Sequence, residues 1–187
     1  MRLKGLGGYK PMIFGNKNVF AIECEISERI DDWVFGHFLF WLCGQSIGDW
    51  EDSTDIKGCL LWLKDFVNIA RNRFEEDLTE LNKDAVFELL YHSVMQSNAS
   101  ITHQIQNYDD IYSRFHISHI GMSSFDTFSL LLIEQPNGPQ RCLWQSESSE
   151  EINECYIPQK EMQRVAELCC TWLEQEIATG VDERCST

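Results

Sequence analysis

An apolar run from Trp33 to Cys43 constrains the fold of this chain more than any other feature. Its residues, WVFGHFLFWLC, are apolar at odd and even positions alike, interrupted only by Gly36 and His37. A membrane-spanning helix needs about 20 apolar residues, and this run is about half that long. Aromatic residues favour strands. The run therefore predicts a central β-strand covered on both faces, with Gly36 at a bulge or a close approach of the backbone.

The flanking segments predict an α+β protein. Val19–Ile26 alternates, with apolar residues on one face and acids partly on the other, as in a half-buried strand that forms a hairpin with the central one across a turn at SERIDD. Ser53, Thr54 or Asp55 is expected to cap a helix whose apolar stripe runs from Ile56 to Phe74. Periodicity further predicts a helix over 84–96, strands over 113–120, 127–134, 140–145 and 155–157, and a helix after Pro158. We expect an antiparallel sheet of five to seven strands with helices packed against it.

The length of 187 residues suits one domain with a substantial core. We expect a flexible head over residues 1–11, one domain over 12–180 and a flexible tail over 181–187. The head is rich in glycine and lacks the apolar stretch of a secretory signal. The cysteines fall mostly within apolar segments and form no CxxC pair, which favours reduced, buried thiols in a cytoplasmic protein over disulfides or zinc ligands.

The chain is strongly acidic, with 30 Asp and Glu against 15 Lys and Arg, a net charge of −15. Such a charge repels nucleic acid and anionic lipid and speeds the encounter with a basic partner. An acidic run is most often a solvated surface. Several acidic runs in one chain suit a protein whose carboxylates bind a cationic partner in the place of phosphate groups. The candidate contact residues are Glu147, Glu150, Glu151 and Glu154, Asp49 beside the aromatic anchor Trp50, and Asp109 with Asp110.

Motifs for catalysis are missing from the sequence. There is no G-x-S-x-G, phosphate-binding loop or dinucleotide fingerprint, and we predict no catalytic residue, metal site or cofactor. His116 and Ser118 would share one face of a predicted strand, as in phosphoesterases with paired H-x-[ST] motifs, but the second motif is absent. A small hydrolase using His116 and Ser118 is kept as an alternative.

Two stretches, MIFGNKNVFAIECEI and WVFGHFLFWLCGQSIGD, resemble the N-terminal half of the immunity protein 42 family of bacterial polymorphic-toxin systems. The resemblance covers residues 12–49 and extends into the following helix. It implies a cytoplasmic protein, encoded beside a toxin, that binds and neutralises the toxin's C-terminal domain. Such toxins, including those of contact-dependent growth inhibition, are often nucleases. The resemblance carries over no toxin-contact residues.

Three hypotheses follow from the sequence. The first is an immunity protein that occludes the active site of a basic nuclease toxin with its acidic residues. The second is the hydrolase. The third is a generic interaction protein whose acidity serves solubility, and whose binding would be indifferent to salt.

Overall fold

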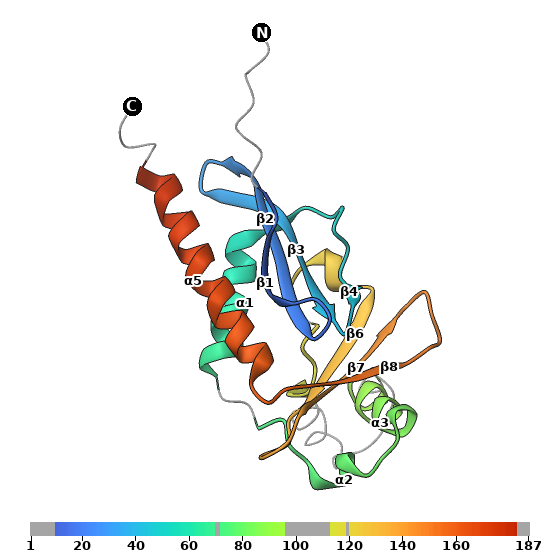
Figure 1. Ribbon diagram of the computed structural model, residues 1–187. Coiled ribbons are helices and arrows are strands. Elements are labelled where there is room, and N and C mark those ends of the chain that lie inside the picture. Colours follow the sequence, from blue (N-terminus) through green and yellow to red (C-terminus); the bar gives the residue numbers. More distant parts are fainter. Residues whose placement is uncertain (1–9, 70–71, 96–112, 119, 183–187) are drawn as a thin grey trace, which may run out of the picture. The chain divides into compact units, whose positions relative to one another are not determined.

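The computed structural model of the protein describes residues 10–69, 72–95, 113–118 and 120–182 (Figure 1). The chain divides into two compact units. The first contains Met1–Asn68, Gly121–Ser124 and Met162–Thr187, and the second contains Ile69–Ile120 and Phe125–Glu161. The α+β class is confirmed, but the strands form two antiparallel sheets, one of five strands and one of three. Most of the expected flexible head and tail lies outside the described residues, and one domain over 12–180 stays a prediction.

The sheet of the first unit is built around the predicted central strand. Its strands are β1 (Met12–Asn16), β2 (Phe20–Ile30), β3 (Trp33–Leu42), β4 (Gln45–Ile47) and β5 (Thr54–Asp55). They run in the order β1-β2-β3-β4, and β5 also pairs with β3. β3 thus pairs with three strands, and its hairpin with β2 is confirmed. β2 is longer than predicted: SERI belongs to the strand, and Asp31 and Asp32 form the turn.

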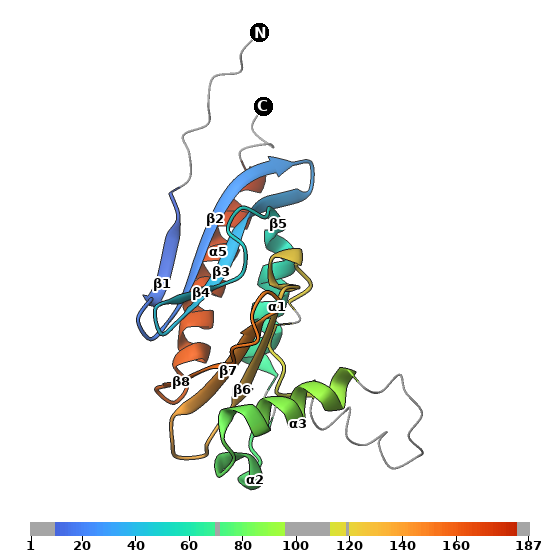
Figure 2. The same cartoon turned by 90° about the vertical axis from the view of Figure 1, so that its right-hand side faces the viewer.

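Two helices cover one face of this sheet. α1 (Ile56–Asn68) and α5 (Glu161–Asp182) lie on the same side of the strands (Figures 1 and 2). The ring of Phe14 on β1 lies 5.6 Å from that of Trp172 on α5. Arg29 of β2 donates a hydrogen bond to the carbonyl oxygen of Glu176 on α5. The apolar alternation of β2 and β3 is therefore satisfied by helices on this side. The residues it buries are Phe20, Ile22, Cys24, Ile26, Val34, Phe38, Phe40 and Leu42.

Gly36 marks both a bulge and a close approach, as its sequence context predicts. The register between β2 and β3 shifts between Ile26 and Glu28, opposite Gly36. A Cβ atom at Gly36 would lie 1.9 Å from the carbonyl oxygen of Glu25 and 3.0 Å from the Cδ1 of Ile56. Only glycine fits at this position, because there is no room for a Cβ atom between the two strands.

Asp55 is the residue that caps α1. Its Oδ1 accepts from the backbone N–H of Lys57 at 3.0 Å, and its Oδ2 accepts from that of Gly58 at 3.2 Å. These bonds satisfy donors that the first turn of a helix leaves without partners. The predicted extent of the helix was wrong: α1 ends at Asn68, and Phe74 lies outside it.

Replacing Asp55 with alanine is expected to lower the free energy of unfolding by about 1 kcal/mol, because both capping bonds disappear. Urea titration followed by circular dichroism measures this change. Asp55→Asn retains an acceptor oxygen and should lose less. Equal losses in both variants would mean that the charge of Asp55, rather than its capping bonds, stabilises the helix.

In the described part of the second unit, the helices α2 (Glu76–Thr79) and α3 (Lys83–Met95) pack against a sheet. The strands of this sheet are β6 (Phe128–Ile133), β7 (Gln140–Ser146) and β8 (Asn153–Ile157). β7 lies between β6 and β8. The apolar core combines residues of both helices and the sheet: Leu78, Val86, Phe87, Leu90, Phe115, Leu131, Ile133 and Leu143.

One element of this unit was not predicted and one prediction was wrong. The segment between the first two predicted helices contains α2, whose Leu78 is buried. The segment 113–118 is not a strand: His116 makes an isolated bridge to Leu131, and the residues before it form a turn. Its alternation arises because Phe115 and Ile117 are both buried.

Candidate interaction site

The loop that follows β7 presents three exposed carboxylates, those of Glu147, Glu150 and Glu151. Serine hydroxyls shape this loop. The Oγ of Ser146 accepts from the backbone N–H of Ser148 at 3.3 Å, and the Oγ of Ser149 accepts from that of Glu151 at 3.1 Å. The loop is held by bonds among its own residues, so the carboxylates are left free to face solvent. We call Ser146–Glu151 the acidic loop.

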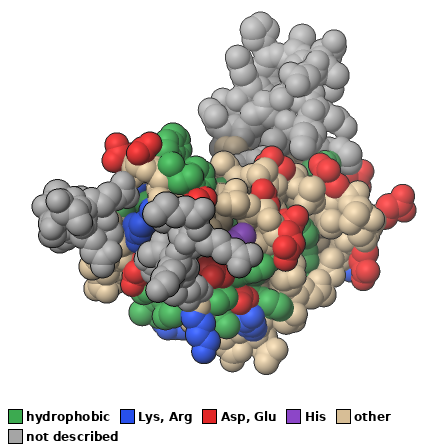
Figure 3. Space-filling view, turned by 90° about the horizontal axis from the view of Figure 1, so that it is seen from above, with side chains coloured by type: hydrophobic (Ala, Val, Ile, Leu, Met, Phe, Trp, Pro, Cys, Tyr) green, Lys and Arg blue, Asp and Glu red, His purple; other side chains and the backbone are tan. Residues whose placement is uncertain are grey.

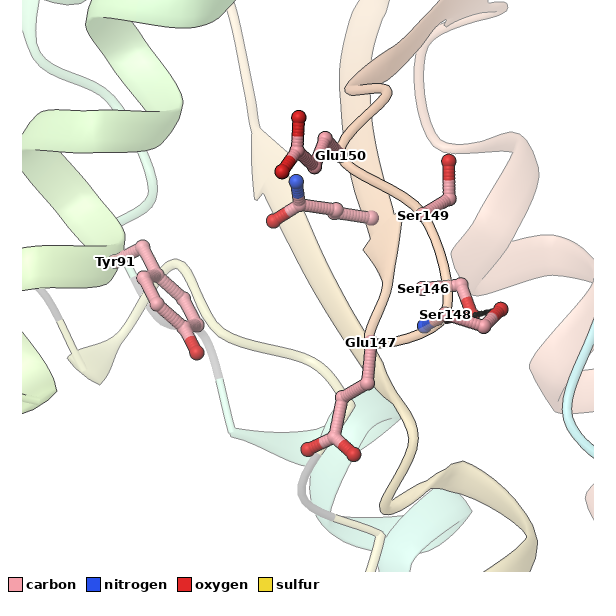
Figure 4. A pocket seen from close by; sticks show the side chains of 7 residues that line it. Tyr91, Ser146, Glu147, Ser148, Ser149 and Glu150 are labelled. Carbon is pink, nitrogen blue, oxygen red and sulfur yellow. Dashed lines mark hydrogen bonds between the residues drawn. The ribbon is translucent and has the colours of Figure 1, made fainter.

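The acidic loop lines a polar hollow of about 520 Å³ together with Tyr91 of α3 and Gln145. Figure 4 shows the carboxylates of Glu147 and Glu150 on the side of the loop nearer Tyr91. Tyr91 is half-buried and its ring stacks on Phe87 at 5.4 Å between centroids. Hydrogen-bond acceptors and carboxylates prevail in this lining, which favours a cationic or hydrogen-bond-donating occupant over an apolar one.

Glu154 differs from the three exposed glutamates. It lies on β8, and its Oε1 accepts from the Nε of Arg141 at 2.6 Å. Arg141 is buried and also donates to the carbonyl oxygens of Leu78 and Leu81. Glu154 therefore neutralises a buried cation that ties β7 to the segment around α2. A contact between Glu154 and a partner stays a prediction.

Asp49 and Trp50 belong to the first unit, apart in the chain from the acidic loop of the second. The Oδ1 of Asp49 accepts from the N–H of Glu51 at 2.9 Å, an ordinary turn interaction. Trp50 is half-buried, and its ring lies 5.3 Å from that of His37 on β3. Asp49 is exposed, so turn formation leaves its second oxygen accessible. Asp109 and Asp110 lie outside the described residues.

His116 and Ser118 do not form a catalytic pair on a strand. The Nε2 of His116 lies 3.2 Å from the carbonyl oxygen of Leu90. A carbonyl only accepts, so Nε2 must carry the proton and cannot take one from a serine hydroxyl. Ser118 is buried, with 6% of its surface exposed. The hydrolase hypothesis thus loses the strand geometry on which it rested.

The described cysteines are free, and all except Cys43 are buried. Burial raises the pKa values of the Cys59 and Cys169 thiols, and it raises the pKa of Cys170 to about 11, with the nearby Glu174 carboxylate adding to the effect. These thiols are protonated at neutral pH and are poor nucleophiles. Cys185 lies outside the described residues.

Other classes of site are not seen in the described part of the chain. Residues 10–69, 72–95, 113–118 and 120–182 contain no group of three or more His, Cys, Asp or Glu arranged to hold a metal ion. No helix within these ranges is long and apolar enough to cross a membrane.

Tyr91, which lies across the hollow from the acidic loop, was not predicted as a site residue. The only signal in the sequence was its spacing from Phe87: the two residues are one helical turn apart, so Tyr91 lies near the apolar face of α3. Glu28 was not assigned to a strand either, because the turn was predicted at SERIDD, whereas β2 continues to Ile30. The alternation of Glu23 and Glu25 indicated the first part of the outward face of β2, but Glu28 reaches it only through the bulge after Ile26, which the spacing of the residues does not show.

Comparison with known proteins gives a family and a fold. A family model described as immunity protein 42 matches residues 12–172. No curated protein sequence matches the chain significantly. The crystal structure of CdiI from Burkholderia dolosa AUO158 is similar, with a TM-score of 0.66 over 86% of this chain and 99% of that chain, at 17% identity. The structural likeness concerns the fold, whereas the family match spans most of the sequence. The chain therefore belongs to the immunity protein 42 family.

Proposed function

We propose that this protein binds and neutralises a cognate toxin domain by occluding its active site. The observation that carries the proposal is the family match over residues 12–172. The similarity to the CdiI structure further supports a toxin of a contact-dependent inhibition system. In this proposal the protein acts by binding in the cytoplasm and performs no catalysis of its own.

The proposed toxin is a nuclease with a basic substrate surface. A nuclease binds phosphates through cationic side chains, and the net charge of −15 suits such a partner. The exposed Glu147, Glu150 and Glu151 would occupy the phosphate-binding track, with Tyr91 beside them in the hollow. Asp49 and Trp50 would contribute a second contact. The steering by carboxylates is expected to raise the association rate more than the final affinity.

A triple charge reversal tests the acidic loop. Glu147→Lys, Glu150→Lys and Glu151→Lys together should weaken binding to the toxin domain about 10-fold or more, mainly through a slower, less salt-dependent association. Surface plasmon resonance at several salt concentrations measures both effects. The control reverses three other exposed acids, Asp65, Asp126 and Glu167. If the control slows association equally, only the net charge matters, and the generic hypothesis replaces a specific contact by this loop.

A further inference from the structure

The hairpin of β2 and β3 has a face that the helices of its own unit leave uncovered. In Figure 2, α5 lies behind the strands, and the opposite face of the hairpin is turned toward the viewer. We call this the hairpin face. Strand alternation, corrected for the bulge after Ile26, assigns ten residues to it, of which Ala21 and Leu39 are buried. They are Ala21, Glu23, Glu25, Glu28 and Ile30 from β2, and Trp33, Phe35, His37, Leu39 and Trp41 from β3.

The hairpin face combines a row of carboxylates with a row of rings. Glu25 is the cross-strand partner of His37, and Glu28 is the partner of Phe35. The rings of Trp33 and Phe35 stack, with centroids 6.1 Å apart and planes 14° apart. Trp33 is 56% exposed, which is unusual for the largest apolar side chain on a strand. Seen from above, the surface of the protein also has hydrophobic side chains next to acidic ones (Figure 3).

One end of the hairpin face already holds a cation between these two rows. The Nζ of Lys17 lies 4.0 Å from the centroid of the Trp41 ring and 2.6 Å from the Oε2 of Glu23. The indole Nε1 of Trp41 donates to the same carboxylate oxygen at 2.7 Å. The ammonium group is thus bound by a ring face and a carboxylate at once, an arrangement that strengthens both interactions.

A carboxylate and a ring also lie next to each other at two further positions of the hairpin. Glu28 is exposed beside Phe35 and Trp33, and Glu25 lies beside His37, which packs against Trp50. Neither Glu25 nor Glu28 forms an ion pair with a residue in the described ranges. Within those ranges, the buried Nδ1 of His37 also lacks a hydrogen-bond partner. The face therefore has surplus negative charge next to the exposed ring of Trp33 and the half-buried ring of Phe35.

We propose that the hairpin face docks the toxin through a segment that bears arginine or lysine, with Trp33 and Phe35 as anchors and Glu25 and Glu28 as the carboxylates that pair with the incoming cations. This inference rests on the proposed function and adds a docking surface on the first unit to the contact proposed for the acidic loop. Lys17 over Trp41 shows within the chain how such a cation is bound. The stacked rings supply apolar area, and the glutamates select a cationic partner.

The test measures binding by isothermal titration calorimetry. Its probe is the purified C-terminal toxin domain encoded beside the immunity gene, the arrangement that the family resemblance implies. One variant carries Trp33→Ala and Phe35→Ala, and a second carries Glu25→Lys and Glu28→Lys. The matched control carries Leu61→Ala and Asp65→Lys, which remove an exposed apolar side chain and reverse an exposed acid on α1. Unfolding midpoints establish that each variant is folded.

Each face variant is expected to weaken binding about 30-fold or more, whereas the control should bind like the wild type. If both face variants are folded and bind like the wild type, the hairpin face is not the docking surface, and the proposed function stands without it. If the wild type itself fails to bind the toxin domain, the proposed function falls and this inference falls with it. Equal weakening in the control also overturns the inference.

Discussion

Gly36→Ala is expected to lower the free energy of unfolding by about 3 kcal/mol or more. The added methyl group would lie 1.9 Å from the carbonyl oxygen of Glu25, a backbone atom of the paired strand. To relieve this clash, β2 and β3 would have to separate at the bulge. A shift in the other direction is blocked by the side chain of Ile56, whose Cδ1 would lie 3.0 Å from the added methyl group. Urea unfolding monitored by circular dichroism measures the loss.

Gly58→Ala is the matched control for this substitution. Gly58 lies in the first turn of α1, and its added methyl group would meet only the Asp55 side chain, at 3.5 Å or beyond. Alanine is favoured over glycine in helices, so this variant should be more stable by about 0.5–1 kcal/mol. Opposite signs for the two variants would attribute the loss at Gly36 to the strand contact. A near-neutral Gly36→Ala would contradict the close approach of the two strands.

Arg141→Met is expected to lower the free energy of unfolding by about 3 kcal/mol. Arg141 is 3% exposed, and its guanidinium pairs with Glu154 and donates to the carbonyl oxygens of Leu78 and Leu81. The variant leaves a largely buried carboxylate and two carbonyl groups without their donor. Adding Glu154→Leu to Arg141→Met should recover part of the loss, because the buried charge disappears.

The Lys64–Glu174 pair provides the control for burial. Its N–O distance of 2.6 Å equals that of the Arg141–Glu154 pair, but its side chains are 41% and 51% exposed, against 4% and 25%. Lys64→Met should change stability by less than about 1 kcal/mol, since solvent screens an exposed pair. Equal losses for Lys64→Met and Arg141→Met would show that burial of the guanidinium is not what makes Arg141 important.

Periodicity predicted the elements of this fold that bury an apolar face. The hairpin of β2 and β3, the helix α3 and the pairing of β6 with β7 all lie close to their predicted ranges, because each buries residues at a regular spacing. The same rule failed for residues 113–118. Phe115 and Ile117 alternate with polar residues there, but their backbone forms a turn and one bridge instead of a strand.

Long-range polar contacts were beyond the reach of the sequence. Arg141 and Leu78 are far apart in the chain, and nothing local indicates that the guanidinium lies against the carbonyl group. The acidic run therefore appeared uniform, whereas the structure separates the exposed Glu147, Glu150 and Glu151 from the paired Glu154. The division of the strands between two sheets was equally hidden, because alternation reports burial and not which strands pair.

Because the last helix, α5, covers part of the sheet of the first unit, the order of synthesis affects how this unit folds on the ribosome. The sheet is made from the beginning of the chain, but α5, which covers part of its apolar face, is among the last segments to be synthesised. At a synthesis rate of about 5–20 residues per second, Trp172 is made on the order of ten seconds after Phe14, the residue whose ring it contacts. A nascent or truncated chain that lacks α5 therefore exposes part of the apolar face of the sheet. We expect chaperones and proteases to bind such chains.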